Sequence, residues 1–311
     1  MTEAVGPFDA AAVFFNWLPL SHIYARLCDA YLALLSGSTL AFAESQATIV
    51  ADLAEMRPTH FTGVPRFYEK ILASVPCDRL SRIFAGIRWL SSGGAPLPIA
   101  VLDAYREAGL VIHQGYGLTE TAPVISTNRR HANRPGTVGL PIRGALVRIA
   151  EDGEILTRGP HVMAGYWKHP SPVVDGWLPT GDLGRLDDDG FLTITGRKKE
   201  LIVLSGGKNV APNRIEALLV RVPAIEQAIV VGDGRPYLTA LVVPRLAKVD
   251  EAELLRRIEA ALVDVAPWER VRKIAIVEPF TVDAGELTVS AKLRRGVICA
   301  KHRERIDAMY I

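Results

Sequence analysis

Residues 114–121 read Gln114-Gly115-Tyr116-Gly117-Leu118-Thr119-Glu120-Thr121, and they follow Leu110–Gln114, a short apolar run typical of a buried strand. The two glycines allow a sharp turn and a close approach of the backbone to a ligand. The tyrosine ring between them can stack on a base. A hydroxyl and a carboxylate follow, which suit a phosphate oxygen and Mg²⁺ respectively. On residue types alone, a glycine-rich turn that carries a core tyrosine is the alternative.

A second glycine-rich stretch lies upstream, Ser91-Ser92-Gly93-Gly94-Ala95-Pro96-Leu97, between a strand candidate and a helix candidate. Alternating strands and helices predict an α/β fold with a largely parallel sheet, in which ligands bind outside the carboxyl ends of the strands. We therefore expect both glycine-rich loops to face one crevice. For the second loop alone, a tight turn before a helix is the alternative. The expected strands are Ala11–Leu18, Thr39–Ala43, His60–Val64, Ile87–Leu90 and Leu110–Gln114, and the expected helices are Ala25–Leu35 and Ile99–Ala108.

The middle of the chain is predicted to be β-rich, and the last part to be a small α+β domain. Glu151-Asp152-Gly153 separates two strand candidates and indicates a hairpin, and Phe191–Thr195 is a further strand candidate. Glu251–Val265 has the spacing of an amphipathic helix. We place the domain boundary near Gly196–Lys199, which gives domains of residues 1–196 and 197–311. The remaining candidates are strands at Val147–Ala150, Glu154–Arg158, Ala228–Val231, Leu238–Val243 and Lys273–Val277, and a helix that begins near Pro212.

Three further segments carry residues suited to nucleotide chemistry. Thr180-Gly181-Asp182 offers a carboxylate that can accept both hydroxyls of a ribose, although a solvated turn is the alternative. The run from Gly196 to Asn209 places Arg197, Lys198 and Lys199 at the expected boundary and ends in a flexible Gly206-Gly207, which suggests a hinge. Lys292 lies within Leu287–Arg295, and a single lysine of this kind does not by itself indicate a function.

Composition excludes several other functions. Lys+Arg is 36 against Asp+Glu 34, a balance that argues against a nucleic-acid-binding protein. The three cysteines form no C-x-x-C pair, so neither a disulfide framework nor a zinc cluster is supported, and we expect reduced thiols in a cytoplasmic protein. No secretory signal or membrane-spanning run is found. A peripheral membrane contact is left open.

Taken in order, these five segments resemble the shared motifs of the adenylate-forming (AMP-binding) superfamily, which includes acyl-CoA synthetases, luciferases and the adenylation domains of peptide synthetases. Other segments resemble its long-chain fatty acyl-CoA synthetase branch: Trp17–His22, Gly37–Thr39, Val64–Lys70, Pro135–Gly139 and Ser205–Pro212. The resemblance implies a partial large adenylation domain, mostly parallel sheet plus a β-rich subdomain, followed by a small lid domain. It also implies that a fatty acid is adenylated by ATP with Mg²⁺ and then transferred to CoA.

The resemblance also implies a role for each matching residue. Gly93, Gly94, Ala95 and Tyr116 would frame the adenine, and Gly117 would be a further cofactor-binding residue. Thr119 would contact the α-phosphate and Glu120 would hold Mg²⁺. Asp182 and Arg197 would bind the ribose, Lys292 would neutralise charge during adenylation, and Lys199 would be the hinge. Gly206 and Gly207 would line the path of CoA. His22 and Gly115 would lie at the acyl pocket, although a structural histidine is the alternative for His22.

Two departures from the family pattern leave other functions open. The Ser/Thr/Gly-rich loop that ends in Pro-Lys and cradles the β- and γ-phosphates has no counterpart in residues 1–16, so we expect an N-terminally truncated member. The segment between Lys70 and Ser91 is also shorter than in long-chain members. The alternatives are a non-catalytic remnant that binds AMP or acyl-adenylate, one half of a split synthetase completed by an N-terminal fragment, and a ligase for a different carboxylic acid. A homo-oligomer is also left open.

Overall fold

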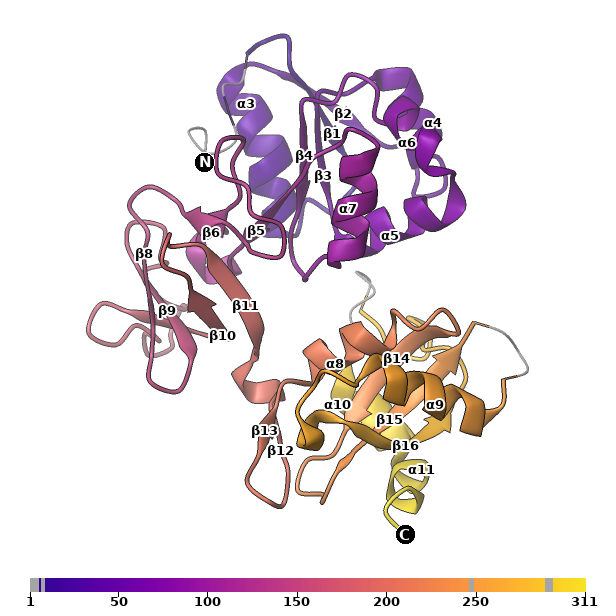
Figure 1. The fold of residues 1–311 in the computed structure, drawn as a ribbon. Helices are drawn as coiled ribbons and strands as arrows, with labels where there is room; N and C mark the ends of the chain where they lie inside the picture. Colours follow the sequence, from indigo (N-terminus) through magenta and orange to yellow (C-terminus); the bar gives the residue numbers. More distant parts are fainter. Residues whose placement is uncertain (1–5, 7–8, 246–248, 289–292) are drawn as a thin grey trace. The chain divides into compact units, whose positions relative to one another are not determined.

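A computed structural model describes residues 6, 9–245, 249–288 and 293–311. The chain divides into two compact units, Met1–Ile194 and Thr195–Ile311, which are described separately below (Figure 1). The first unit ends two residues before residue 196, the end that the sequence suggested for the first domain.

The large unit is built on a sheet in the order β2-β1-β3-β4-β5-β6-β7, and neighbouring strands from β2 to β5 are parallel. This confirms the predicted α/β fold with a largely parallel sheet. The last two strands extend the sheet in the antiparallel sense. The strands are β1 (Val13–Asn16), β2 (Thr39–Phe42), β3 (His60–Gly63), β4 (Trp89–Ser92), β5 (Ile112–Tyr116), β6 (Ser126–Thr127) and β7 (Leu140–Pro141).

Helices cover both faces of this sheet, with α3 (Leu32–Ser36) on one side and α4 to α7 on the other (Figure 1). The second face holds the larger core, in which Phe15, Phe61, Tyr68 and Leu90 are fully buried or nearly so. Apolar side chains on alternate positions of the strands supply the sheet side of both cores. The helices are α4 (Ile49–Met56), α5 (Pro65–Ser74), α6 (Cys77–Ile83) and α7 (Ile99–Glu107).

The prediction of one regular helix over Ala25–Leu35 is wrong. The segment consists of α2 (Ile23–Ala25), a π-helix η1 (Arg26–Tyr31) and α3 (Leu32–Ser36), and it ends at Gly37 with φ +64°. The wider π turn carries Asp29 into the interior, where Asn16 Nδ2 donates a 2.9 Å hydrogen bond to its carboxylate. Apolar periodicity cannot reveal one extra residue in a turn, and such turns often lie near functional sites.

A second sheet in the large unit confirms the β-rich middle of the chain. Its order is β11-β10-β9-β8, and the β8–β9 hairpin turns at the predicted Glu151-Asp152-Gly153. Gly153 has φ +84°, a conformation that favours glycine. The strands are β8 (Leu146–Ile149), β9 (Glu154–Arg158), β10 (Leu178–Leu186) and β11 (Leu192–Arg197).

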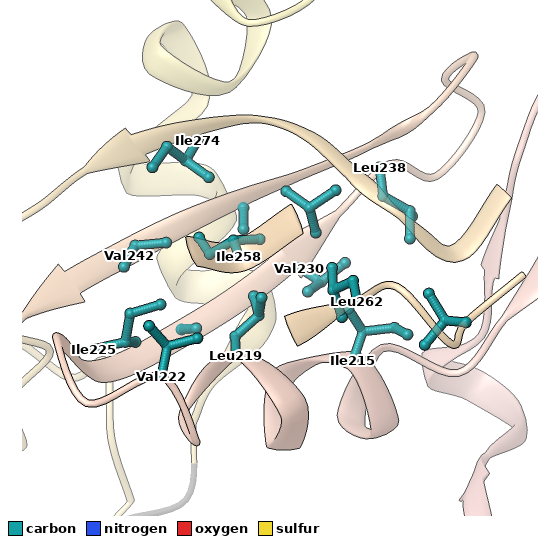
Figure 2. Close-up of a cluster of buried hydrophobic side chains, with 14 of the residues drawn as sticks. Ile215, Leu219, Val222, Ile225, Val230, Leu238, Val242, Ile258, Leu262 and Ile274 are labelled. Carbon is teal, nitrogen blue, oxygen red and sulfur yellow. The ribbon is translucent and has the colours of Figure 1, made fainter. Parts of the chain in front are cut away.

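The small unit packs helices on a sheet in the order β14-β15-β16 (Figure 2). Its core joins Ile215 and Leu219 of α8 to Ile258 and Leu262, all fully buried, which confirms the amphipathic face predicted for Glu251–Val265. The Asp250 side chain caps the helix by accepting a hydrogen bond from Glu253 N. The elements are β12 (Ile202–Val203), β13 (Asn209–Val210), α8 (Pro212–Leu219), β14 (Ile225–Val231), β15 (Leu238–Pro244), α9 (Glu251–Ala261), β16 (Val271–Ile276), α10 (Arg295–Lys301) and α11 (Arg303–Ala308). Among the helices of the described segments, none has the length and apolar character needed to cross a bilayer.

Three buried titratable groups in the large unit make its stability depend on pH. Burial raises the pKa of Asp29 to about 7, although hydrogen bonds from Thr62 and Asn16 oppose this rise. Burial lowers the pKa of both His60 and His113 to about 4. Because of these two histidines, the folded state loses stability as pH falls from the ordinary histidine pKa toward 4. Asp29 acts in the opposite sense. The folded state favours its protonated form, so its contribution to the stability of the protein is lost as pH rises through about 7.

The substitution Asp29→Asn isolates the carboxyl's contribution. The amide stays neutral at every pH, so the variant should gain stability relative to wild type as pH rises from about 5 to about 8.5. The expected change is on the order of 2–4 kcal/mol. Thermal unfolding of both proteins across this range measures it. A wild-type-minus-variant difference that does not change with pH would show that Asp29 does not titrate there.

Candidate functional site

Two glycine-rich loops leave adjacent strands at the same edge of the large sheet. Ser92 at the end of β4 pairs in parallel with Gln114 of β5, so the loops that follow begin side by side. Gly93 is buried, whereas Gly94 and Ala95 are exposed at this edge. The two loops therefore leave neighbouring strands, and their exposed backbone lies where parallel sheets bind ligands. That both loops face one crevice stays a prediction.

The loop after β5 requires glycine at one position for steric reasons. A Cβ on Gly117 would lie 1.8 Å from the carbonyl oxygen of Pro123, so no side chain fits without a backbone shift. A short 3₁₀ helix, η2 (Thr119–Thr121), follows, and Leu118 N donates a 2.8 Å hydrogen bond to Oγ1 of Thr121. The turn therefore holds Thr119 exposed and Glu120 half-buried.

Tyr116 and Asp182 come from different sheets and meet in a direct contact. The Tyr116 hydroxyl donates a 2.8 Å hydrogen bond to Oδ2 of Asp182, which is 3% exposed. The turn before Asp182 is fixed because Gly181 N donates to the Glu154 carboxylate at 2.9 Å and Thr180 Oγ1 donates to Ile155 O at 2.8 Å. The aromatic ring and the carboxylate suited to a base and a ribose are thus brought together.

Glu120 is held by a segment that follows β9. The Tyr166 hydroxyl donates to Oε1 of Glu120, and Met163 N donates to the Glu120 carbonyl oxygen at 2.9 Å. The hydrogen bond to Glu120 raises the pKa of Tyr166, which therefore keeps its proton. One carboxylate oxygen of Glu120 is engaged in this way, which orients the group.

The chemistry of these donors fits Mg²⁺ carried by a nucleotide. Among the residues that the structure describes, no cluster of three His, Cys, Asp or Glu side chains could hold a metal alone. Mg²⁺ is commonly bound by one or two carboxylates together with substrate phosphates and water. A single carboxylate such as that of Glu120 is compatible with this mode of binding.

Two buried polar atoms at the strand ends also fit a site that receives a polar ligand or water. Ser92 Oγ and Gln114 Oε1 find no hydrogen-bond partner among the described residues. They belong to residues that pair directly across β4 and β5. Buried polar groups are normally hydrogen-bonded, so a pair without partners marks a place where water or a ligand completes the network.

The other predicted site residues have separate positions. His22 caps α2, where its Nδ1 accepts a 3.2 Å hydrogen bond from Tyr24 N, and Gly115 lies within β5. Arg197 ends β11, and Lys199 is exposed in the 3₁₀ helix η3 (Lys198–Glu200). Gly206 and Gly207 form the exposed turn between β12 and β13. Lys292 lies outside the described residues.

Sequence reasoning missed Tyr166 and Glu154. Tyr166 stands in Ala164-Gly165-Tyr166-Trp167, an exposed aromatic pair after a glycine that could have suggested a contact with the site. Glu154 was assigned only to a strand. Its buried carboxylate gives no sequence signal, because a single acidic residue after a turn is ordinarily solvated.

Comparison with known proteins matches both units. A family model described as AMP-binding enzyme matches residues 1–167, and one described as AMP-binding enzyme C-terminal domain matches residues 199–311. The long-chain-fatty-acid–CoA ligase FadD15 of Mycobacterium tuberculosis is 35% identical over 369 residues, which covers 94% of this chain and 61% of that protein. The chain therefore spans less than two thirds of the length of this relative.

Solved structures agree with the fold. MatB from Rhodopseudomonas palustris with bound ATP superposes with a TM-score of 0.81 at 27% identity, covering 95% of this chain and 61% of that one. The o-succinylbenzoate CoA synthetase MenE from Bacillus subtilis, in complex with its acyl-adenylate intermediate, gives 0.80 at 26% identity over 94% of this chain and 61% of that one.

The steric requirement for glycine at position 117 can be tested by comparing substitutions at positions 117 and 115. Gly117→Ala should cost at least the ~1–3 kcal/mol typical of overpacked sites. Gly115→Ala serves as the matched control, because a Cβ there would meet its nearest atom at an ordinary 3.4 Å. Thermal unfolding compares the two variants. Equal stability of both would contradict the close approach of residues 117 and 123.

Proposed function

The chain belongs to the AMP-binding enzyme family, and from that premise we propose that it binds AMP and ATP at the edge of its large sheet and ligates a long-chain fatty acid to CoA. The observation that carries the proposal is the junction of Tyr116 with the buried Asp182 beside the Gly93–Ala95 loop. The name of the FadD15 relative supports the choice of a fatty acid as substrate.

In the proposed first step, a carboxylate oxygen of the fatty acid attacks the α-phosphorus of ATP, and the bond to pyrophosphate breaks. Thr119 lies exposed at the start of η2, where its hydroxyl can hydrogen-bond an α-phosphate oxygen. Glu120 would hold Mg²⁺, which neutralises phosphate charge when bound. Lys292 would add a positive charge, since stabilising charge that develops in the transition state is a major source of catalysis.

In the proposed second step, the CoA sulfur attacks the acyl carbon, and AMP leaves with the electron pair of the acyl–oxygen bond. Gly206 and Gly207 carry no side chain into the turn that the pantetheine arm would pass. Arg197 and Asp182 would hold the ribose through both steps, and Lys199 would be the hinge between them. His22 and Gly115 are proposed for the acyl side of the site.

A second candidate function is binding of AMP or acyl-adenylate without turnover. It is favoured because the contacts on which the site is built, the Tyr116–Asp182 hydrogen bond and the pairing that places the Gly93–Ala95 loop, concern the nucleotide alone.

Ribose recognition can be tested without turnover. Asp182→Asn should weaken AMP binding about tenfold or more, because hydrogen bonds to a charged group are worth ~1.5–3 kcal/mol. Isothermal titration calorimetry measures the dissociation constant. The penalty should vanish for 2′,3′-dideoxy-AMP, which lacks both hydroxyls. An equal penalty for the two nucleotides would show that Asp182 acts on the fold and not on the ribose.

Turnover is tested by mixing the purified chain with ATP, Mg²⁺, palmitate and CoA and by detecting palmitoyl-CoA and AMP by mass spectrometry. Glu120→Gln should lower the rate about 10–100-fold, as expected when a metal site is weakened, and Lys292→Ala about 100–1,000-fold. Glu107→Gln, at an exposed carboxylate on α7, is the control and should match wild type. Folded protein that binds AMP but yields no product would favour the second candidate.

A further inference from the structure

Two tyrosines from opposite faces of the large sheet converge on the strand end that carries the Gly93–Ala95 loop. Tyr24 belongs to α2, and Tyr68 belongs to α5. Tyr68 lies within Val64–Lys70, and Tyr24 stands two residues after Trp17–His22; both segments resemble the long-chain branch. The proposed chemistry gives neither tyrosine a role.

Tyr24 contacts the loop from the face that η1 and α3 cover. Its hydroxyl lies 3.1 Å from Oγ of Ser91, the residue before the last of β4. Its ring fills the space where a side chain at position 93 would stand, since a Cβ on Gly93 would lie 2.9 Å from Tyr24 Cζ. One side chain thus holds both Ser91 and Gly93.

Tyr68 reaches the same strand from the other face. It is fully buried, and its hydroxyl donates a 2.7 Å hydrogen bond to the carbonyl oxygen of Ser91. Its ring also fills the space beside Gly63, where a Cβ would lie 2.7 Å from Cε2. Gly93 N in turn donates to Gly63 O at 3.3 Å, so the loop is attached to the strand end that Tyr68 fixes.

From this geometry we infer that Tyr24 and Tyr68 act as a clamp that sets the position of the Gly93–Ala95 loop against the nucleotide base. They are positioning residues, because both hydroxyls act through Ser91. The inference rests on the proposed nucleotide site. Burial raises the pKa of both phenols well above the ordinary value, so both keep their protons across the working range of pH.

The chain offers a matched control in Tyr105. It is as fully buried as Tyr68, stands edge-to-face against it with ring centroids 5.4 Å apart, and donates to Tyr68 O at 3.2 Å. This hydrogen bond joins α7 to α5, whereas the hydroxyls of Tyr24 and Tyr68 contact Ser91 of β4. Removing its hydroxyl therefore perturbs the same core without releasing the loop.

The test measures AMP and GMP affinity by calorimetry for wild type, Tyr24→Phe, Tyr68→Phe and Tyr105→Phe. The first two variants should bind AMP about three- to tenfold more weakly, as the loss of one hydrogen bond implies. Their AMP-to-GMP affinity ratio should also fall, because the displaced loop frames the base. Tyr105→Phe should lose thermal stability while both nucleotide affinities stay at wild-type values.

Ser91→Ala provides a second route to the same contact. It removes the Ser91 hydroxyl that contacts Tyr24, so it should weaken AMP binding as much as Tyr24→Phe does. Combining Ser91→Ala with Tyr24→Phe should weaken binding little further than either substitution alone. Additive penalties, unchanged affinity in both clamp variants, or equal losses in all three tyrosine variants would overturn the clamp. A wild-type chain that binds no AMP would overturn the proposed site itself, and the clamp with it.

Discussion

Parallel pairing of β3, β4 and β5 brings their carboxyl ends to one edge of the large sheet, and the candidate site depends on this register. A slip by one residue would turn Ser91 and His113 to the opposite face. The buried aromatic core opposes such a slip, because Phe61 and Tyr68 pack edge-to-face with ring centroids 6.2 Å apart. Register thus connects core packing to the position of the loops.

Polar contacts then transmit this order from the strand ends to the second sheet. Tyr116 reaches Asp182, whose turn is fixed by the buried Glu154. Glu120 is fixed by Tyr166 from the segment after β9. The Tyr116 ring and the carboxylates of Asp182 and Glu120, which are proposed for the base, the ribose and Mg²⁺, are therefore oriented by residues from separate parts of the unit. Such orientation before binding reduces the entropy that a ligand must lose.

Much of this architecture could be predicted from the sequence because its signals are local. Apolar runs gave the parallel strands, Glu151-Asp152-Gly153 gave the hairpin, and the glycines around Tyr116 marked the loop after β5. The π turn at Asp29 and the contact of Tyr166 with Glu120 could not be predicted. The first depends on one inserted residue that leaves the apolar pattern intact, and the second joins positions 46 residues apart. The roles proposed for the site residues, those of Arg197, Lys199 and Lys292 included, stay predictions that rest on the family resemblance.

The proposed AMP site lies at the edge of the large sheet, between the two glycine-rich loops and Asp182. Amide chemical-shift mapping of the isotopically labelled chain during titration with AMP tests this location. The shifts should gather at Gly93–Ala95, Tyr116–Glu120 and Gly181–Asp182. Shifts confined to the small unit, or none at saturating AMP, would contradict it.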